Sequence, residues 1–135
     1  HKLNKMNYTT DKIKVRYYET DQMGIVHHSN YLKFFEFARI EWLEKLKMPY
    51  EEIEKNNIIL PVVKCELKFI KPLVFGDSFN VKVSCLKKPT SSIEFSYEIF
   101  KSNGEKTTEG ITLLAFLNSK SMKVIKCPTI IRNLF

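Results

Sequence analysis

The sequence predicts an α+β fold, in which a curved antiparallel sheet wraps one long central helix and the elements follow the order β-α-β-β-β-β. Apolar residues recur at helical spacing over residues 30–48, and four later segments alternate apolar and polar residues. Asn103-Gly104 is typical of a tight hairpin turn. The 135 residues, 44% of them hydrophobic, suffice for a single domain over residues 1–135, in which residues 1–10 are expected to form a flexible tail.

The first strand is predicted over residues 12–17. Ile13, Val15 and Tyr17 are apolar and the residues that precede each of them are basic. Because successive side chains of a strand point to opposite faces, this alternation predicts one buried and one exposed face. A loop that contains Gly24 follows, over residues 19–29.

The long helix is predicted to begin near Ser29 or Asn30, either of which suits an N-cap, and to end at Met48 because Pro49 follows. Many further apolar residues widen its apolar stripe, so the helix is expected to be buried on more than one side. A short second helix is predicted over residues 50–56. The positions that set the helical spacing are Tyr31, Phe35, Ala38 and Trp42.

Four strands are predicted after the helices, over residues 63–69, 79–85, 93–99 and 107–117. Strands with a single buried face leave open sheet edges, and pairing with a second copy is one way to cover an edge. We therefore expect a homodimer or a homotetramer. In the last strand, one face carries Glu109, Ile111, Leu113, Ala115 and Leu117.

Composition narrows the class of protein. Three cysteines without paired spacing argue against a disulfide framework or a zinc finger, and no run of about 18 apolar residues indicates a membrane span. We therefore expect a cytoplasmic protein. The net charge of +7 fits a solvated basic surface or an anionic partner, but the basic residues are dispersed and no nucleic-acid motif occurs, so no nucleic acid is expected as a partner.

The segment from Tyr17 to Tyr31 carries the residues best suited to chemistry. The first turn of a helix offers unpaired backbone N–H groups that can hold a carbonyl oxygen, and Asp21 could act on the same carbonyl carbon directly or through a water. Each residue also has an ordinary interpretation. An aspartate in a loop is commonly a turn residue, Gly24 can serve the turn alone, and the pair His27-His28 is more often structural than metal-binding.

Two motifs flank the start of the long helix: Thr20-Asp21-x-Met23-Gly24-x-Val26-x-His28-x-Asn30-Tyr31 and Phe34-Phe35-Glu36-x-Ala38-Arg39. A third segment is Lys71-Pro72-Leu73-Val74-Phe75-Gly76-Asp77. Together they resemble the signature of hotdog-fold acyl-CoA thioesterases, nearest to the 4-hydroxybenzoyl-CoA thioesterase/YbgC-like branch. The resemblance covers most of the chain and implies a hotdog fold, in which two protomers join their sheets and active sites form between them.

The resemblance also implies thioester hydrolysis without a metal or other cofactor. It makes Asp21 the catalytic carboxylate, as general base or as nucleophile, and places His28 near the thioester. Such proteins often have a tyrosine shortly before the acid, a position for which Tyr17 and Tyr18 compete; we assign Tyr18 to catalysis. The remaining expected site groups are the backbone amides of Gly24, Ile25 and Val26, which would polarise the carbonyl, and the substrate-binding side chains of Tyr31 and Tyr17.

The leading hypothesis is hydrolysis of an acyl thioester to a free carboxylic acid and the thiol. The acyl group is carried by CoA or by acyl-carrier protein. A hotdog dehydratase acting on hydroxyacyl thioesters is the second hypothesis, although an aspartate just before the long helix favours hydrolysis. A protein that binds an acyl thioester or another anionic ligand without catalysis is the third.

Overall fold

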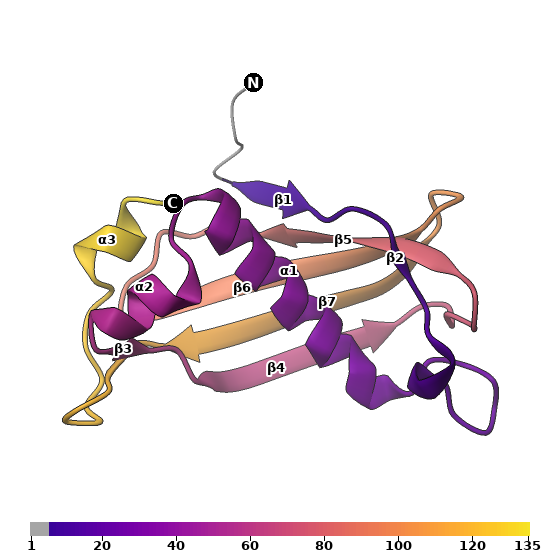
Figure 1. Ribbon diagram of the computed structural model, residues 1–135, viewed down its shortest axis with the longest axis horizontal. Helices are drawn as coiled ribbons and strands as arrows, with labels where there is room; N and C mark the ends of the chain where they lie inside the picture. The colour runs from indigo at the N-terminus through magenta and orange to yellow at the C-terminus, as the bar shows by residue number, and fades with distance from the viewer. Residues whose placement is uncertain (1–5) are drawn as a thin grey trace.

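The computed structural model describes residues 6–135, and its main feature is an antiparallel sheet crossed on one face by a single long helix (Figure 1). The strands follow the order β1-β5-β6-β7-β4, and β2 also pairs with β5. Their bounds are β1 (Asn7–Thr9), β2 (Ile13–Lys14), β4 (Val62–Phe69), β5 (Ser78–Ser84), β6 (Ser92–Lys101) and β7 (Lys106–Ala115).

The other elements are short, apart from the long helix α1. A separate two-stranded ribbon joins β3 to β8, and two 3₁₀ turns, η1 and η2, precede α1. The bounds are η1 (Tyr17–Glu19), η2 (His28–Asn30), α1 (Tyr31–Lys45), α2 (Tyr50–Lys55), β3 (Ile58–Ile59), β8 (Leu117–Asn118) and α3 (Thr129–Arg132).

The predicted α+β architecture is confirmed, with α1 lying over the sheet and packing closely on β5. The helix ends at Lys45, earlier than predicted, and Lys47 takes a positive φ of 66° in the turn before Pro49. Seven of its fifteen residues are buried, and they lie on one face of the helix. The expectation of burial on more than one side is therefore wrong, since Leu32 and Phe37, which were to widen the apolar stripe, are exposed. The buried residues are Tyr31, Phe34, Phe35, Ala38, Arg39, Trp42 and Leu43.

The buried face of the last long strand, β7, is the less apolar of its two faces. Gly110, Thr112 and Leu114 of β7 are buried, whereas Ile111 and Leu113 are only partly covered. The reason is the space under α1: a Cβ atom at Gly110 would lie 2.3 Å from the Phe35 ring, and the Thr112 hydroxyl is hydrogen-bonded to the Tyr97 hydroxyl at 2.6 Å. Small and hydrogen-bonding residues fit this surface, so burial in β7 does not follow hydrophobicity.

The chain before the helix is less regular than predicted. The strand predicted over residues 12–17 is regular only at Ile13–Lys14 and then gives way to η1. Of the tail predicted over residues 1–10, residues 1–5 lie outside the described residues. Asn7–Thr9 is instead the strand β1, paired with residues 82–84 of β5, so the prediction of a tail is wrong there. No helix of the described part of the chain is long and apolar enough to span a bilayer.

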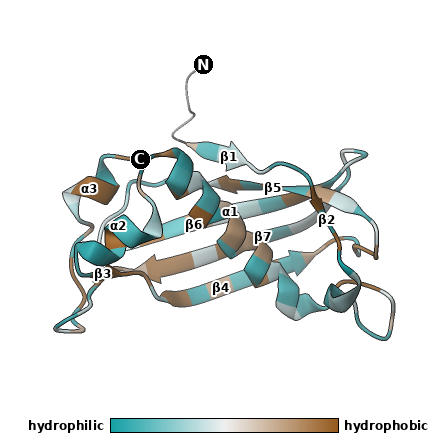
Figure 2. Ribbon diagram, in the orientation of Figure 1, coloured by the Kyte–Doolittle hydropathy of each residue, from teal (hydrophilic) through white to brown (hydrophobic). Residues whose placement is uncertain are grey.

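The sheet has two very different edges. At one edge, β1 and β2 are short and are separated from each other by residues 10–12. At the other, β4 is eight residues long, and Leu67 is its one residue that is not exposed. Hydrophobic residues begin this open strand, where Val62 and Val63 are 47% and 57% exposed (Figure 2).

Candidate active site

A compact loop places Asp21 just ahead of the long helix. The Asp21 amide donates to the Ile25 carbonyl at 2.8 Å, and the Gly24 amide donates to the Asp21 carbonyl at 2.9 Å. Gly24 has a φ of 81°, a conformation that residues with a Cβ atom rarely adopt. Of the two carboxylate oxygens of Asp21, Oδ1 accepts a hydrogen bond from the Met23 amide at 2.8 Å. Oδ2 has no hydrogen-bond partner in the part of the chain that the structure describes.

Glu19 anchors this loop, a role that the sequence did not reveal. Its carboxylate is buried and accepts hydrogen bonds from the Arg16 guanidinium at 2.9 Å and from the Arg16 amide at 2.8 Å. Its carbonyl accepts a hydrogen bond from the His27 amide and another from the Asn30 side chain, both at 2.8 Å. A buried carboxylate is costly unless it is paired, and Arg16 pairs this one. The two hydrogen bonds of the carbonyl then tie the start of the loop to its end.

The loop borders a cavity of about 310 Å³ that also reaches the end of β4. Asp21 and His28 line it together, so the structure brings the predicted acid and the predicted histidine to one place. Most of the remaining wall is apolar, as is common in pockets that bind small molecules. The other lining residues are Met23, Ile25, Val26, Tyr31, Phe69, Ile70, Lys71 and Pro72.

Two of the three predicted oxyanion amides are already in use. The Gly24 amide donates to the Asp21 carbonyl, and the Val26 amide donates to the Leu73 carbonyl at 2.8 Å. The Ile25 amide has no acceptor among residues 6–135, and Ile25 lines the cavity. The geometry therefore narrows the predicted group of donors to the Ile25 amide.

Tyr31 forms part of the cavity wall from the first turn of α1. Its side chain is almost fully buried and meets the Phe69 ring edge-on, with the ring centroids 5.1 Å apart. Burial raises the pKa of Tyr31 above its ordinary value, although hydrogen bonds from the Leu73 backbone and the Thr108 side chain act in the opposite direction. Tyr31 therefore stays protonated at neutral pH and is suited to shaping the pocket rather than to transferring a proton.

The structure does not place Tyr17 or Tyr18 in this cavity. Both side chains are more than three-quarters exposed, and the Tyr17 ring packs edge-on against Phe75. Tyr18 lies beside the Arg16 guanidinium and lines a different cavity of about 420 Å³. The assignment of Tyr18 to catalysis and of Tyr17 to substrate binding therefore finds no support in this geometry, because residues 17–19 form a turn instead of continuing the strand.

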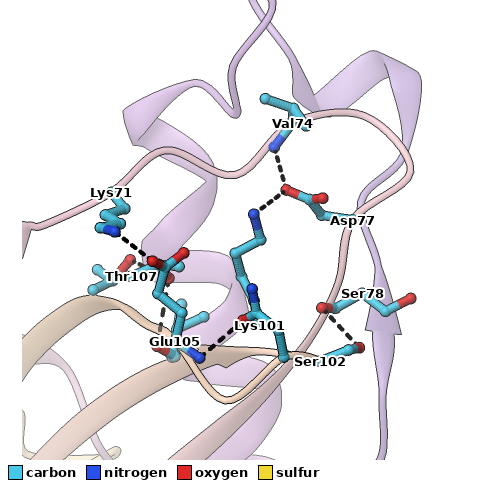
Figure 3. Close-up of polar contacts among 11 residues, drawn as sticks. Lys71, Val74, Asp77, Ser78, Lys101, Ser102, Glu105 and Thr107 are labelled. Carbon is cyan, nitrogen blue, oxygen red and sulfur yellow. Dashed lines mark hydrogen bonds and ion pairs between the residues drawn. The ribbon is translucent and has the colours of Figure 1, made fainter.

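Lys71 supplies the positive charge of the cavity wall. It forms an ion pair with Glu105 of the turn between β6 and β7 (Figure 3). A second ion pair joins Lys101 Nζ to Asp77 Oδ2 at 3.5 Å. Lys71 begins the Lys71–Asp77 motif, which could have pointed to it, but the sequence did not show that this turn meets the Asp21 loop. Residues 6–135 contain no group of three or more His, Cys, Asp or Glu side chains that could hold a metal ion.

Comparison with known proteins places the fold and the site in context. A family model described as the thioesterase-like superfamily matches residues 15–135. A 1,4-dihydroxy-2-naphthoyl-CoA hydrolase of Prochlorococcus marinus is 34% identical, with 77% of this chain and 72% of the relative covered. An acyl-acyl carrier protein thioesterase of Arabidopsis thaliana is 31% identical over 92% of this chain, which spans 65% of that relative.

A solved structure has the same fold as this chain. The DHNA-CoA thioesterase of Staphylococcus aureus superposes with a TM-score of 0.84 and is 34% identical. The matched region covers 89% of this chain and 80% of that protein. The fold predicted from the sequence, a hotdog with a single long helix, is thereby confirmed.

Proposed function

We propose that this chain, which belongs to the thioesterase-like superfamily, hydrolyses acyl-CoA thioesters at the cavity between the Asp21 loop and the end of β4. Water and the acyl-S-CoA thioester give a free carboxylic acid and CoA with its thiol. The observation that carries the proposal is Asp21: a half-buried carboxylate with one oxygen free, in a largely apolar cavity next to an unpaired backbone amide.

Each group in the cavity has a distinct part in the proposed reaction. The Asp21 carboxylate either takes a proton from the attacking water or attacks the thioester carbonyl itself. The Ile25 amide stabilises the negative charge that develops on the carbonyl oxygen. His28, exposed at the cavity, orients the thioester, and Tyr31 and Phe69 contact the acyl group.

The carrier of the acyl group is an anionic thiol, either CoA or acyl-carrier protein. The net charge of +7 favours an anionic ligand, since positive charge attracts one. Lys71 lies at the cavity wall but is paired with Glu105, so it would bind such a ligand only by exchanging that partner. The two relatives described above are named for one carrier each, so both carriers belong in the assay. We place the reaction in the cytoplasm, which suits three cysteines that are all free thiols.

We also propose that the active form is a homodimer, or a tetramer made of two such dimers, joined through the open edge of β4. This edge is long, exposed and contiguous with the cavity, since Phe69 both ends β4 and lines the wall. A second strand on this edge would satisfy its free backbone groups and would shield one side of the cavity from water.

The decisive experiment is a hydrolysis screen of the purified protein over short, long and aromatic acyl-CoAs, with the same acyl groups on acyl-carrier protein. We expect release of both the free acid and the thiol, detected by mass spectrometry, at a rate proportional to protein concentration. A 3-hydroxyacyl-CoA and the matching enoyl-CoA belong in the same panel, because their interconversion without thiol release would instead indicate a dehydratase. Binding of acyl-CoA without turnover of any substrate would contradict catalysis and favour a ligand-binding protein.

A further inference from the structure

The hydrogen-bonding groups on the open edge of β4 belong to alternate residues. The Ile70 amide donates to the Thr107 carbonyl at 2.8 Å, and the two residues continue the register that pairs Phe69 with Thr108. Bonded and non-bonded pairs alternate along an antiparallel ladder. The even-numbered residues of β4 therefore direct their backbone groups toward β7, and Cys65, Leu67 and Phe69 direct theirs to the open edge.

The two faces of β4 carry different side chains. Leu67 packs against the core and Phe69 contacts Tyr31 of α1, so the odd-numbered residues face the helix. The charged residues alternate with them on the outer face and are all exposed. In order along the strand they are Lys64, Glu66 and Lys68.

Symmetry limits how two copies of β4 can pair. A two-fold axis perpendicular to a continuous sheet keeps each face on its own side. Residues directly opposite each other share a face, so the axis must lie midway between one residue and its own copy. That residue is called the residue on the axis. Every possible register is therefore defined by the residue on the axis.

Charge selects between these registers. An axis at Lys64, Glu66 or Lys68 puts like charges directly opposite each other, which destabilises a strand pair. An axis at Cys65 puts Glu66 opposite the partner's Lys64, and an axis at Leu67 puts Glu66 opposite the partner's Lys68. These two registers are the ones that form two complementary pairs.

Backbone geometry separates the two remaining registers. The pairing of β4 with β7 is irregular between Val62 and Lys64. An axis at Cys65 would place Leu67 opposite the partner's Val63, inside this irregular segment. An axis at Leu67 uses only the regular stretch from Lys64 to Ile70. All three residues that direct backbone groups to the edge then form bonded pairs: Leu67 with its own copy, and Cys65 with the partner's Phe69 in both directions.

We propose that two copies of this chain pair through β4 with Leu67 on the two-fold axis and Glu66 opposite the partner's Lys68. The inference rests on the dimer of the proposed function and adds its register. It also assigns a residue to the site: the partner's Cys65 lies opposite Phe69 on the helix-facing side, where Phe69 lines the Asp21 cavity. The wall of each cavity is thus completed by the other copy.

A charge exchange tests this register. Glu66→Lys alone places two lysine pairs across the axis, and Lys68→Glu alone places two glutamate pairs there, so each variant should dimerise about tenfold more weakly than the wild type. Mixed together, the two variants should form a heterodimer with about wild-type affinity, because a lysine then faces a glutamate in both pairs across the axis. Sedimentation and native mass spectrometry of the full chain measure both effects without reference to catalysis.

The control variant is Lys64→Glu, on the same face of the same strand. In the proposed register it faces the partner's Ile70 and should dimerise with nearly wild-type affinity. Rescue of Glu66→Lys by Lys64→Glu, and not by Lys68→Glu, would place the axis at Cys65 and overturn the proposal. Repulsion within one chain, such as that between Lys64 and the lysine introduced by Glu66→Lys, is not relieved by mixing, so rescue reports contacts across the axis.

Disulfide formation provides an independent test. With Leu67 on the axis, the two Cys65 residues are offset by four residues, about 13 Å along the strands, which is too far for a disulfide. Under mild oxidation, the wild type should therefore give no Cys65 cross-link, whereas Leu67→Cys in a Cys65→Ser background should give a cross-linked dimer. A Cys65 cross-link in the wild type would contradict the register. A protein that dimerises as described but hydrolyses no thioester would contradict the proposed function alone.

Discussion

The core beneath α1 and the cavity beside the Asp21 loop differ in how far their side chains are buried and paired. In the core, Phe35 is fully buried and stacks on Tyr97 with ring centroids 4.3 Å apart, and the Tyr97 hydroxyl is hydrogen-bonded to Thr112. In the cavity, Asp21 keeps one carboxylate oxygen free and Phe69 is 54% exposed. The core therefore supplies stability, whereas the cavity leaves groups available for a ligand.

The start of the Asp21 loop explains how both kinds of environment can lie within a few residues of each other. Glu19 is buried and fully paired like a core residue, yet Asp21, two residues later, is half-exposed. The loop is anchored by Glu19, and the carboxylate of Asp21 stays available to react. Substitutions in the two regions should accordingly separate: those in the cavity should lower activity without lowering stability, and those in the core should do the reverse.

The largest expected effect in the cavity is that of Asp21→Asn. The substitution keeps the shape of the side chain, and an amide oxygen can still accept the Met23 hydrogen bond, but the general base or nucleophile is lost. A positioned carboxylate is worth about 10²- to 10⁴-fold in rate, so kcat for the best acyl-CoA should fall by that factor. Thermal unfolding should stay within a few degrees of the wild type.

Asp11→Asn is the matched control, because Asp11 is an exposed aspartate that does not line the cavity. It should leave both kcat and thermal unfolding unchanged. Thiol release must be compared with a control that contains only enzyme, since Cys65 is exposed and free. A folded Asp21→Asn variant with wild-type kcat would show that the reaction takes place elsewhere.

The largest expected effect in the core is that of Phe35→Ala. Removing a fully buried phenylalanine leaves a cavity and typically costs about 3–5 kcal/mol in the free energy of unfolding. The stacked contact with Tyr97 is lost as well. Chemical denaturation at a temperature where the variant is still folded measures this loss, and kcat per folded molecule should change far less than in Asp21→Asn.

Phe37→Ala provides the matched comparison on the same helix, since Phe37 is 50% exposed. Its cost should stay below about 1 kcal/mol, because little of the ring leaves water on folding. Equal destabilisation by Phe35→Ala and Phe37→Ala would mean that the outer surface of α1 is covered in solution.

The sequence predicted the long helix, the four main strands and the meeting of Asp21 with His28, because helical and alternating patterns are strong signals over long segments. It did not predict which face of β7 is buried, since Gly110 and Thr112 are not apolar and their burial depends on Phe35 and Tyr97. It also gave no sign of the strand at Asn7–Thr9, because a strand of three residues is too short for a pattern.

The site was predicted in part for a related reason. The motif brought Asp21, Ile25 and His28 together because they are close in sequence, but it could not show that the Val26 amide is bonded to Leu73. Lys71 and Phe69 were missed as wall residues because they reach the cavity only through the fold. Contacts between distant segments depend on tertiary structure, which local spacing does not encode.

A smaller effect is expected at His28, which sharpens the assignment within the cavity. The loss of one orienting hydrogen bond is worth about 1.4 kcal/mol, so His28→Ala should lower kcat by about tenfold. His27 is the matched control: its Nδ1 accepts a hydrogen bond from the Ser29 amide at 3.2 Å, and it does not line the cavity. His27→Ala should lower stability slightly through the lost cap and leave kcat nearly unchanged. The same loss of kcat at both positions would indicate that the two histidines, whose rings stack with centroids 4.2 Å apart, act as a unit.

The smallest expected effect is that of Tyr18→Phe, which tests whether the boundary of the cavity is where the structure puts it. The Tyr18 ring is 77% exposed, and its hydroxyl has no hydrogen-bond partner among residues 6–135. Phenylalanine keeps the ring beside Arg16, so neither stability nor the loop anchored by Glu19 should change. We expect kcat and KM within about twofold of the wild type, measured over the same acyl-CoAs as for Asp21→Asn, since a surface substitution rarely exceeds about 0.5 kcal/mol. A loss of kcat near that of Asp21→Asn, with unchanged thermal unfolding, would mean that the loop rearranges on substrate binding and brings the Tyr18 hydroxyl to the thioester.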